Sequence, residues 1–292
     1  VCSSDLGELK KTKTGELSLY NNILKIISAP EFYSGEDETL KTILINRNKL
    51  ESVLRNFLND RGVIEVNSKL LNKYAGTSNI NSFKTTDLEG VNYFLRFTME
   101  LEIKKYLAKT QMPVFEIGSV FRNMGKSKRR LNEFRSAEIY LPYKELDEGI
   151  DLIKEIIHTT TKEFNKEINN IEVMSFTDLI KNKLNPNISI DETVKKICHD
   201  IILNLETPHI IKNPFASWAS PLIKKNSEGY AMDAKFYYKG IGTIIQVCEE
   251  ETDYISIQQS FKKQEIELQN KKKDIRSEEH TSELQSRFGI SY

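Results

Sequence analysis

The alternating strand patterns and amphipathic helical stripes of this 292-residue sequence are compatible with an α+β fold. Two alternating apolar runs, Val114–Phe121 and Phe134–Tyr140, flank a polar, basic loop, which is the pattern of an antiparallel strand pair with a long tip. Apolar residues at helical spacing precede and follow this pair. With 39% apolar residues, the chain can bury one large core.

The first helix is predicted to begin at Asn46, a residue type common at helix N-caps, and to end before Gly62. One face of it carries an apolar stripe of Leu50, Val53, Leu54, Phe57 and Leu58. The stripe fits core packing and a subunit contact equally well. A short strand, Val63–Val66, follows. Residues 20–45 are predicted to be a linker, because Pro30 and Gly35 break regular structure.

After the strand pair, a second helix is predicted to carry four apolar residues on one face: Leu146, Ile150, Ile153 and Ile157. Residues 165–207 mix helix and loop. Two further strands, Ala234–Lys239 and Thr243–Cys248, are joined by a glycine-rich turn. We interpret it as a hairpin turn, since no helix start follows at the spacing of a phosphate loop. A polar helix is predicted from Tyr254 to about Lys273.

Both ends of the chain, residues 1–6 and 276–292, resemble in-frame translations of sequencing adaptors, so we expect them to lie outside the fold. A genuine charged tail is the alternative. Without these ends, 40 basic and 38 acidic residues remain of 42 each, so bulk charge indicates no polyanionic partner. The remaining Cys and His residues show no metal-ligand spacing. No stretch has the apolar length of a membrane span and no secretory leader is visible, which predicts a cytoplasmic protein.

The strand pair carries the residue types that hold a nucleotide and a cationic amino acid together. Arg122 suits a phosphate and a carboxylate, the ring of Phe134 can stack on a base, and Glu138 and Tyr140 suit an ammonium group. A surface hairpin with a solvated basic tip is the alternative interpretation.

Four segments resemble one family, and they occur along the chain in the same order as in that family. The strand pair, with FRN, a basic loop, NEF and AEIY, is similar to motif 2 of the class II aminoacyl-tRNA synthetases. Residues 95–107, LRFTMELEIKKYL, resemble a segment of the lysyl-tRNA synthetases. Residues 12–19, TKTGELSL, resemble the end of their anticodon-binding barrel. SPLIKK (220–225), EETD (250–253) and QQSFKKQ (258–264) complete the resemblance.

This resemblance implies a class II catalytic core, an antiparallel sheet flanked by helices. Residues 7–19 would be the last strand of an N-terminal OB-fold domain, and residues 46–275 a truncated catalytic domain that lacks motif 3. Residues 46–68 would form the interface of a homodimer. The implied activity is ATP-dependent activation of lysine and its transfer to tRNA(Lys).

The resemblance also implies roles for individual residues. Arg122, the predicted catalytic residue, would bridge the α-phosphate of ATP and the lysine carboxylate. Phe134 would stack on adenine, and Arg130 would reach the γ-phosphate. The amino-acid pocket would consist of Gly76, Glu100, Glu138, Tyr140, Gln246 and Glu250. Of these, Tyr140 and Glu250 would hold the side-chain ammonium.

Several positions depart from the family pattern. Met124 replaces a glutamate that reads adenine, and Ser68 replaces a proline of motif 1. Thr243 stands where one metal-binding glutamate of the family is expected. Near the position of the second metal-binding glutamate, Phe236 and Tyr237 supply no carboxylate. Mg²⁺ is expected from the family but prefers oxygen ligands such as carboxylates, so we predict no metal site here, unless Glu249 or Glu251 compensates.

These departures leave two alternatives beside an active synthetase. One is a catalytically silent synthetase-like binding or regulatory paralogue. The other is a lysyltransferase that acts on a protein, against which the barrel-like residues 12–19 argue, because such relatives lack that domain. Since motif 3 is missing from the sequence, we expect this polypeptide itself to form no adenylate.

Overall fold

The computed structural model describes residues 8–11, 17–20, 38–74, 82–123, 131–181, 202 and 204–270. The chain divides into two compact units, Val1–Asn48 and Lys49–Tyr292, and each is described by itself. In the first unit, β1 (Glu8–Lys11) pairs antiparallel with β2 (Leu17–Tyr20). The prediction of one strand over residues 7–19 is therefore wrong. The sequence between the two strands contains Gly15, a residue type favoured in turns.

Helix α1 (Glu38–Asn59) begins before the predicted Asn46, so residues 38–45 are helical and do not belong to a linker. The two breakers, Pro30 and Gly35, both precede Glu38 in the sequence, and nothing after them interrupts helical spacing. The carboxylate of Glu38 in the first turn also interacts favourably with the helix dipole. The predicted start at Asn46 relied on a capping residue that lies inside the helix.

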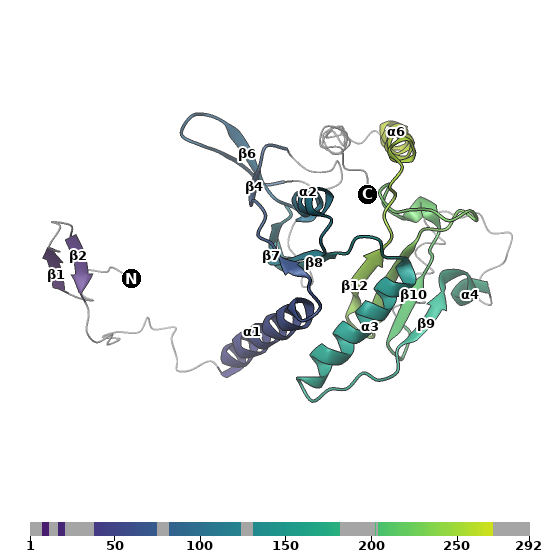
Figure 1. Ribbon diagram of the computed structural model, residues 1–292, viewed down its shortest axis with the longest axis horizontal. Helices are drawn as coiled ribbons and strands as arrows, with labels where there is room; N and C mark the ends of the chain where they lie inside the picture. The colour runs from purple at the N-terminus through teal and green to yellow at the C-terminus, as the bar shows by residue number, and fades with distance from the viewer. Residues whose placement is uncertain are drawn as a thin grey trace. The chain divides into compact units, whose positions relative to one another are not determined.

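The predicted strand pair is confirmed in the second unit. Strand β7 (Val114–Phe121) pairs antiparallel with β8 (Glu133–Tyr140), and β3 (Ile64–Glu65) lies parallel to β7. Helix α2 (Glu100–Thr110) contacts both β7 and β8 (Figure 1). A separate small sheet has the order β4-β6-β5, made of β4 (Leu71–Asn72), β5 (Lys84–Thr86) and β6 (Asn92–Leu95).

A four-stranded sheet has the order β12-β11-β10-β9. The predicted hairpin of β11 (Asp233–Tyr238) and β12 (Gly242–Cys248) is confirmed. Strands β9 (Glu172–Ser175) and β10 (His209–Lys212) pair in parallel, and α4 (Phe176–Lys181) follows β9. Strand β9 lies in the region predicted to mix helix and loop. The sequence does not predict this strand, because four residues are too few to show a periodicity. A 3-10 turn, η2 (Ala216–Trp218), follows β10.

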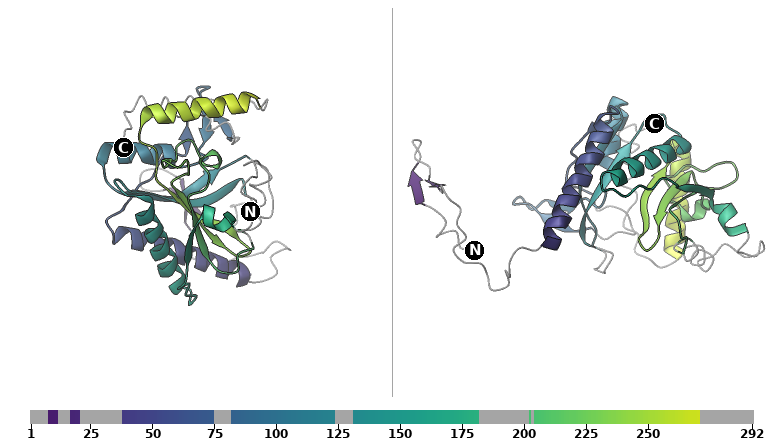
Figure 2. Two further views of the ribbon diagram at one scale, coloured as in Figure 1. Left: turned by 90° about the vertical axis from the view of Figure 1, so that its right-hand side faces the viewer. Right: turned by 90° about the horizontal axis from the view of Figure 1, so that it is seen from below.

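Helix α3 (Leu146–Lys162) lies across one face of this sheet (Figure 1). Its predicted apolar residues are all buried and pack against Ile210, Ala234 and Phe236 of the sheet. Part of the α1 stripe is also core, since Phe57 and Leu58 pack against Phe115 of β7. Helix α6 (Tyr254–Asn270) follows β12 and runs across the top of this unit in the left view of Figure 2.

The described elements form a mixed α+β structure, which confirms the predicted fold class. Its strand pairs are antiparallel except for β3 with β7 and β9 with β10. Helices cover the sheets, as the sequence predicted. Within the ranges that the structure describes, no helix has the length and apolar character to cross a membrane.

Candidate functional site

Strand β8 directs its even-numbered residues toward α2, because successive side chains of a strand point to opposite faces. Phe134 and Tyr140 accordingly pack against buried residues of α2 and β7. Glu138 lies between them in the same alternation. Arg135 points to the other face, where its guanidinium pairs with Glu51 at 2.6 Å. The α2-facing side of β8 therefore collects three of the predicted site residues.

Arg122 lies just after β7, beside Phe134. Its Nε donates a hydrogen bond of 3.1 Å to the carbonyl oxygen of Phe97, and its Cζ lies 5.2 Å from the centroid of the Phe134 ring. Burial lowers the pKa of Arg122, and the nearby Glu138 carboxylate opposes this shift. The structure thus places an anion-binding guanidinium next to an aromatic face that suits a base.

Glu138 is held by donors from two elements. Its Oε1 accepts hydrogen bonds from Thr98 Oγ1 at 3.1 Å and from the Met99 backbone N–H at 3.2 Å. Its Oε2 accepts one from Tyr140 Oη at 3.1 Å. Burial raises the pKa of Glu138 and that of Tyr140, and for Tyr140 the neighbouring carboxylates add to the effect. Tyr140 therefore stays protonated, and its oxygen can accept a further hydrogen bond from an ammonium group.

Glu100 and Glu250 meet at the ammonium of Lys104, a residue that the sequence analysis missed. Lys104 Nζ pairs with Oε1 of Glu100 on its own helix and lies 2.6 Å from Oε2 of Glu250, which follows β12. Burial raises the pKa of Glu250, and the Lys104 ammonium opposes that rise. The signal in the sequence was the position of this lysine, four residues after Glu100 and three residues from both Leu101 and Leu107, which are buried.

Gln246 lies on the same face of the β12 segment as Glu250, two alternations away. Its Nε2 donates a hydrogen bond of 2.9 Å to Oδ1 of Asp233, a second residue that the sequence analysis missed. Asp233 is almost fully buried, and burial raises its pKa. Cys248 lies between Gln246 and Glu250 in the sequence. Burial, together with the charge of Glu250, raises the pKa of its thiol to about 12. Gln246 is thus fixed by a buried carboxyl group.

The residues at the positions that correspond to the family's metal ligands do not fit a magnesium site. The ring of Phe236 lies in the core beneath α3. Tyr237 and Thr243 are register partners of β11 and β12, and neither supplies a carboxylate. Glu249 pairs with Lys224. Within the described ranges, no group of three or more His, Cys, Asp and Glu side chains is arranged to hold a metal ion.

Three residues singled out from the sequence, Gly76, Met124 and Arg130, lie outside the described residues. Ser68 is described, and its backbone N–H donates to Oε2 of Glu116 at 2.9 Å. Its hydroxyl accepts from Arg96 Nη1 at 2.7 Å, and Arg96 pairs with Glu116 at 2.5 Å. Since proline has no N–H, serine adds two hydrogen bonds to this buried ion pair.

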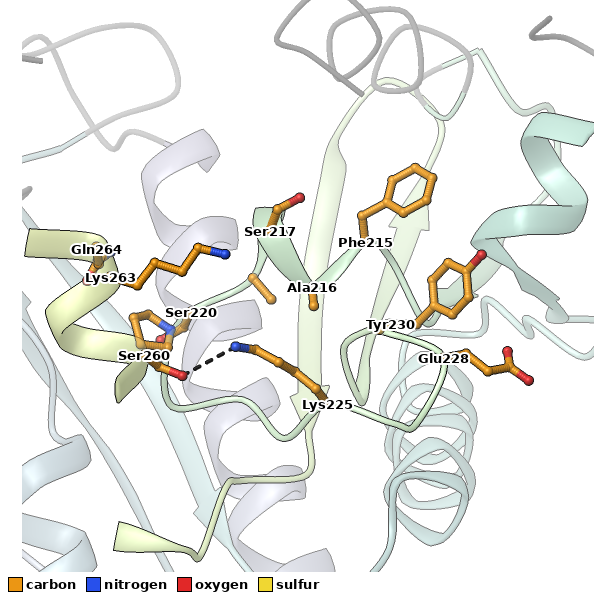
Figure 3. Close-up of a pocket in the computed structure, with 13 residues that line it drawn as sticks. Phe215, Ala216, Ser217, Ser220, Lys225, Glu228, Tyr230, Ser260, Lys263 and Gln264 are labelled. Carbon is orange, nitrogen blue, oxygen red and sulfur yellow. Dashed lines mark hydrogen bonds between the residues drawn. The ribbon is translucent and has the colours of Figure 1, made fainter. Parts of the chain in front are cut away.

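Two cavities lie away from these residues. One of about 530 Å³ lies between η2 and α6, and Figure 3 shows the side chains that line it, among them Lys263 and Ser217. Lys225 Nζ donates a hydrogen bond of 3.3 Å to Ser260 Oγ there. A second cavity, of about 500 Å³, lies on the Arg135 side of β8. None of the predicted ATP-binding or amino-acid-binding residues lines either cavity. The candidate site is therefore located by its charged side chains and not by one of these cavities.

The charges of the site favour a cation. The carboxylates of Glu100 and Glu250 pair with the ammonium of Lys104, and that of Glu138 lies near the guanidinium of Arg122. If all five groups are ionised, one negative charge remains. Lysine carries two ammonium groups and one carboxylate, and its single net positive charge matches this excess.

Comparisons with known proteins identify the family of this chain. Residues 31–285 match the family described as "tRNA synthetases class II (D, K and N)". A lysine–tRNA ligase of Listeria welshimeri is 25% identical over 291 residues, which cover 79% of this chain and 58% of that protein. A lysine–tRNA ligase of Thermotoga maritima is 31% identical over 175 residues, covering 52% and 35%. One of Mycoplasma capricolum is 32% identical over 132 residues, covering 44% and 26%. The chain thus spans little more than half of these curated relatives at most.

Proposed function

Because the chain belongs to the class II tRNA synthetases of the aspartate, lysine and asparagine group, we propose that its acidic site binds lysine for ATP-dependent activation and transfer to tRNA(Lys). One observation carries the lysine assignment: Glu100, Glu138 and Glu250 converge from three separate segments of the chain, and of these Glu138 lies near Arg122. A neutral amino acid has no side-chain charge to offset that excess, whereas lysine supplies an ammonium group at the end of its chain.

The site residues bind lysine at both ends in this proposal. Glu250 and the Tyr140 oxygen hold the side-chain ammonium, and Glu100 holds the α-ammonium. Glu138 accepts three hydrogen bonds from protein groups, so it contributes mainly its negative charge. Gln246, fixed by Asp233, orients the amino-acid carboxylate. These contacts place the carboxylate on the side of the site where Arg122 lies.

Arg122 then acts on the first chemical step. A carboxylate oxygen of lysine attacks the α-phosphorus of ATP, a P–O bond forms, and pyrophosphate leaves with the electron pair of the broken bond. Negative charge accumulates on the α-phosphate, and a guanidinium that contacts both reactants stabilises it and aligns them. Phe134 holds the adenine by stacking. In the second step a ribose hydroxyl of tRNA attacks the lysyl carbonyl carbon and AMP leaves.

The family uses Mg²⁺ with ATP, but the donors at the corresponding positions of this chain are Thr243 and the rings of Phe236 and Tyr237. These residues do not fit a metal set, and no step above runs through a metal ion. The same residues favour a second candidate function, a lysine-binding paralogue that forms no adenylate.

Lysine-dependent exchange between ATP and pyrophosphate, on the complete product of the gene, distinguishes the two functions. The proposal predicts exchange with lysine that exceeds exchange with arginine or asparagine, and its loss in Arg122→Ala. Exchange no higher than in Arg122→Ala, for every amino acid tried, would exclude activation. Lysine binding that persists in such an inactive protein would then support the paralogue.

The family also motivates a proposal of a homodimer through residues 46–68. Leu50 and Ile64 keep 44% and 41% exposure in the single chain, which leaves apolar surface on this segment for a second copy. Light scattering coupled to gel filtration measures the mass directly. A mass of one chain at high concentration would contradict the dimer.

A further inference from the structure

Lys104 is the largest side chain that is fully buried among the described residues, and it lies inside the proposed amino-acid site. Burying an ammonium group is costly unless it is paired. Here its stem lies on the buried face of α2, and its ammonium reaches Glu100 and Glu250 on two different elements. The proposed mechanism assigns no step to this cation.

The exposure of the three side chains shows from which side the cation approaches. Lys104 keeps 1% exposure, whereas Glu100 keeps 28% and Glu250 keeps 22%. The Lys104 ammonium therefore lies deeper in the protein than the side chains of Glu100 and Glu250, which both remain partly accessible. A ligand that enters from solvent meets the two carboxylates first.

The groups around the Lys104 ammonium are mostly acidic. They are Glu100 on α2, Glu138 and Tyr140 on β8, Asp233 on β11, Cys248 on β12 and Glu250 just after it; the other cations are Lys235, 3.6 Å from Asp233, and Arg122, near Glu138. Desolvation and the mutual repulsion of carboxylates both favour protonation. For Glu250 these effects raise the pKa, and Lys104 is the named group that opposes them.

We propose that Lys104 is a positioning residue for amino-acid binding: its ammonium holds Glu100 and Glu250 side by side and keeps Glu250 ionised, so that both carboxylates receive the ammonium groups of bound lysine. The proposal rests on the proposed function of this site. It assigns specificity to a residue that does not contact the substrate. Without the cation, the two carboxylates repel each other, and Glu250 takes up a proton at a pH at which it remains ionised in the wild type.

The test is calorimetric titration of L-lysine into the chain and into Lys104→Met, which keeps an apolar stem of similar length. We expect Lys104→Met to bind lysine at least about ten-fold more weakly at about pH 6, with the loss shrinking as the pH rises to about 8. Lys105→Met is the matched control, since the neighbouring Lys105 pairs with Glu102 at 2.5 Å and not with Glu100 or Glu250. Its affinity should stay within about two-fold of the wild type.

Other outcomes overturn the proposal. An equal loss at every pH would mean that Lys104 only packs, and tighter binding in Lys104→Met would mean that it competes with the ligand. If Lys104→Met does not fold, as judged by circular dichroism, Lys104→Arg replaces it. The arginine retains the charge and should keep the wild-type pH profile, so a changed profile in a folded Lys104→Arg would contradict the proposal. A wild-type chain that binds no lysine would instead remove the proposed function itself.

Discussion

Replacing Glu250 by glutamine removes one carboxylate from the site while keeping its size. In the structure this carboxylate lies 2.6 Å from Lys104 Nζ, and its 22% exposure leaves it accessible to a ligand. A hydrogen bond between charged groups contributes about 1.5–3 kcal/mol, which corresponds to roughly a 10- to 150-fold change in the dissociation constant. Lys104 keeps Glu100 as a partner, so the variant should fold.

The assay is calorimetric titration with lysine and, separately, with ATP. Glu250→Gln should weaken lysine binding by about 10- to 150-fold and leave ATP binding within about two-fold. Glu249→Gln is the matched control: it changes the net charge equally, but Glu249 lies on the opposite side of the chain and pairs with Lys224. An equal effect of the two variants on lysine, or equal losses for lysine and ATP in Glu250→Gln, would refute the reasoning.

Lysine affinity should fall with decreasing pH at a midpoint above the ordinary value of about 4.3, because protonation of Glu138, whose pKa burial raises, removes a negative charge; a calorimetric pH series with a midpoint at or below that value would contradict this. Ser68→Pro restores the residue usual in the family, yet it should lower the melting temperature by several degrees. The reason is that it removes the backbone N–H that donates a hydrogen bond of 2.9 Å to Glu116. An unchanged melting temperature would contradict this. Gly149→Ala should lower the free energy of unfolding, measured with denaturant, by about 1–2 kcal/mol, because the added Cβ would lie 2.6 Å from Val247 Cγ2. Adding Val247→Ala should reduce this loss. If the losses of the two variants are additive, the contact is not the cause.

The elements that the sequence predicted correctly are those whose hydrophobic period is long enough to read. Strands β7 and β8 alternate over eight residues each, and α3 buries every residue of its predicted stripe. Strand β9 was missed, because four residues carry too little periodicity and its stability comes from pairing with β10. The start of α1 was misplaced, since Asn46 has the character of a cap but lies within the helix.

The candidate site shows a similar limit. The structure gathers the predicted Arg122, Phe134, Glu138 and Tyr140 because strand alternation already placed them on adjoining faces. The contact of Lys104 with Glu250 joins residues far apart in the chain, and so does that of Gln246 with Asp233 through a sheet register. No local pattern encodes such pairs, because the first depends on how α2 packs against the end of β12 and the second on the pairing of β11 with β12.

The central claim is that this site recognises the side-chain ammonium of lysine through a surplus of partly buried carboxylates. Comparing L-lysine with L-norleucine, which keeps the four-carbon side chain but lacks the terminal ammonium group, tests it most directly by calorimetry on the chain near neutral pH. The account predicts that lysine binds and that norleucine binds at least about ten-fold more weakly. Equal affinities for the two, or a preference for norleucine, would contradict it.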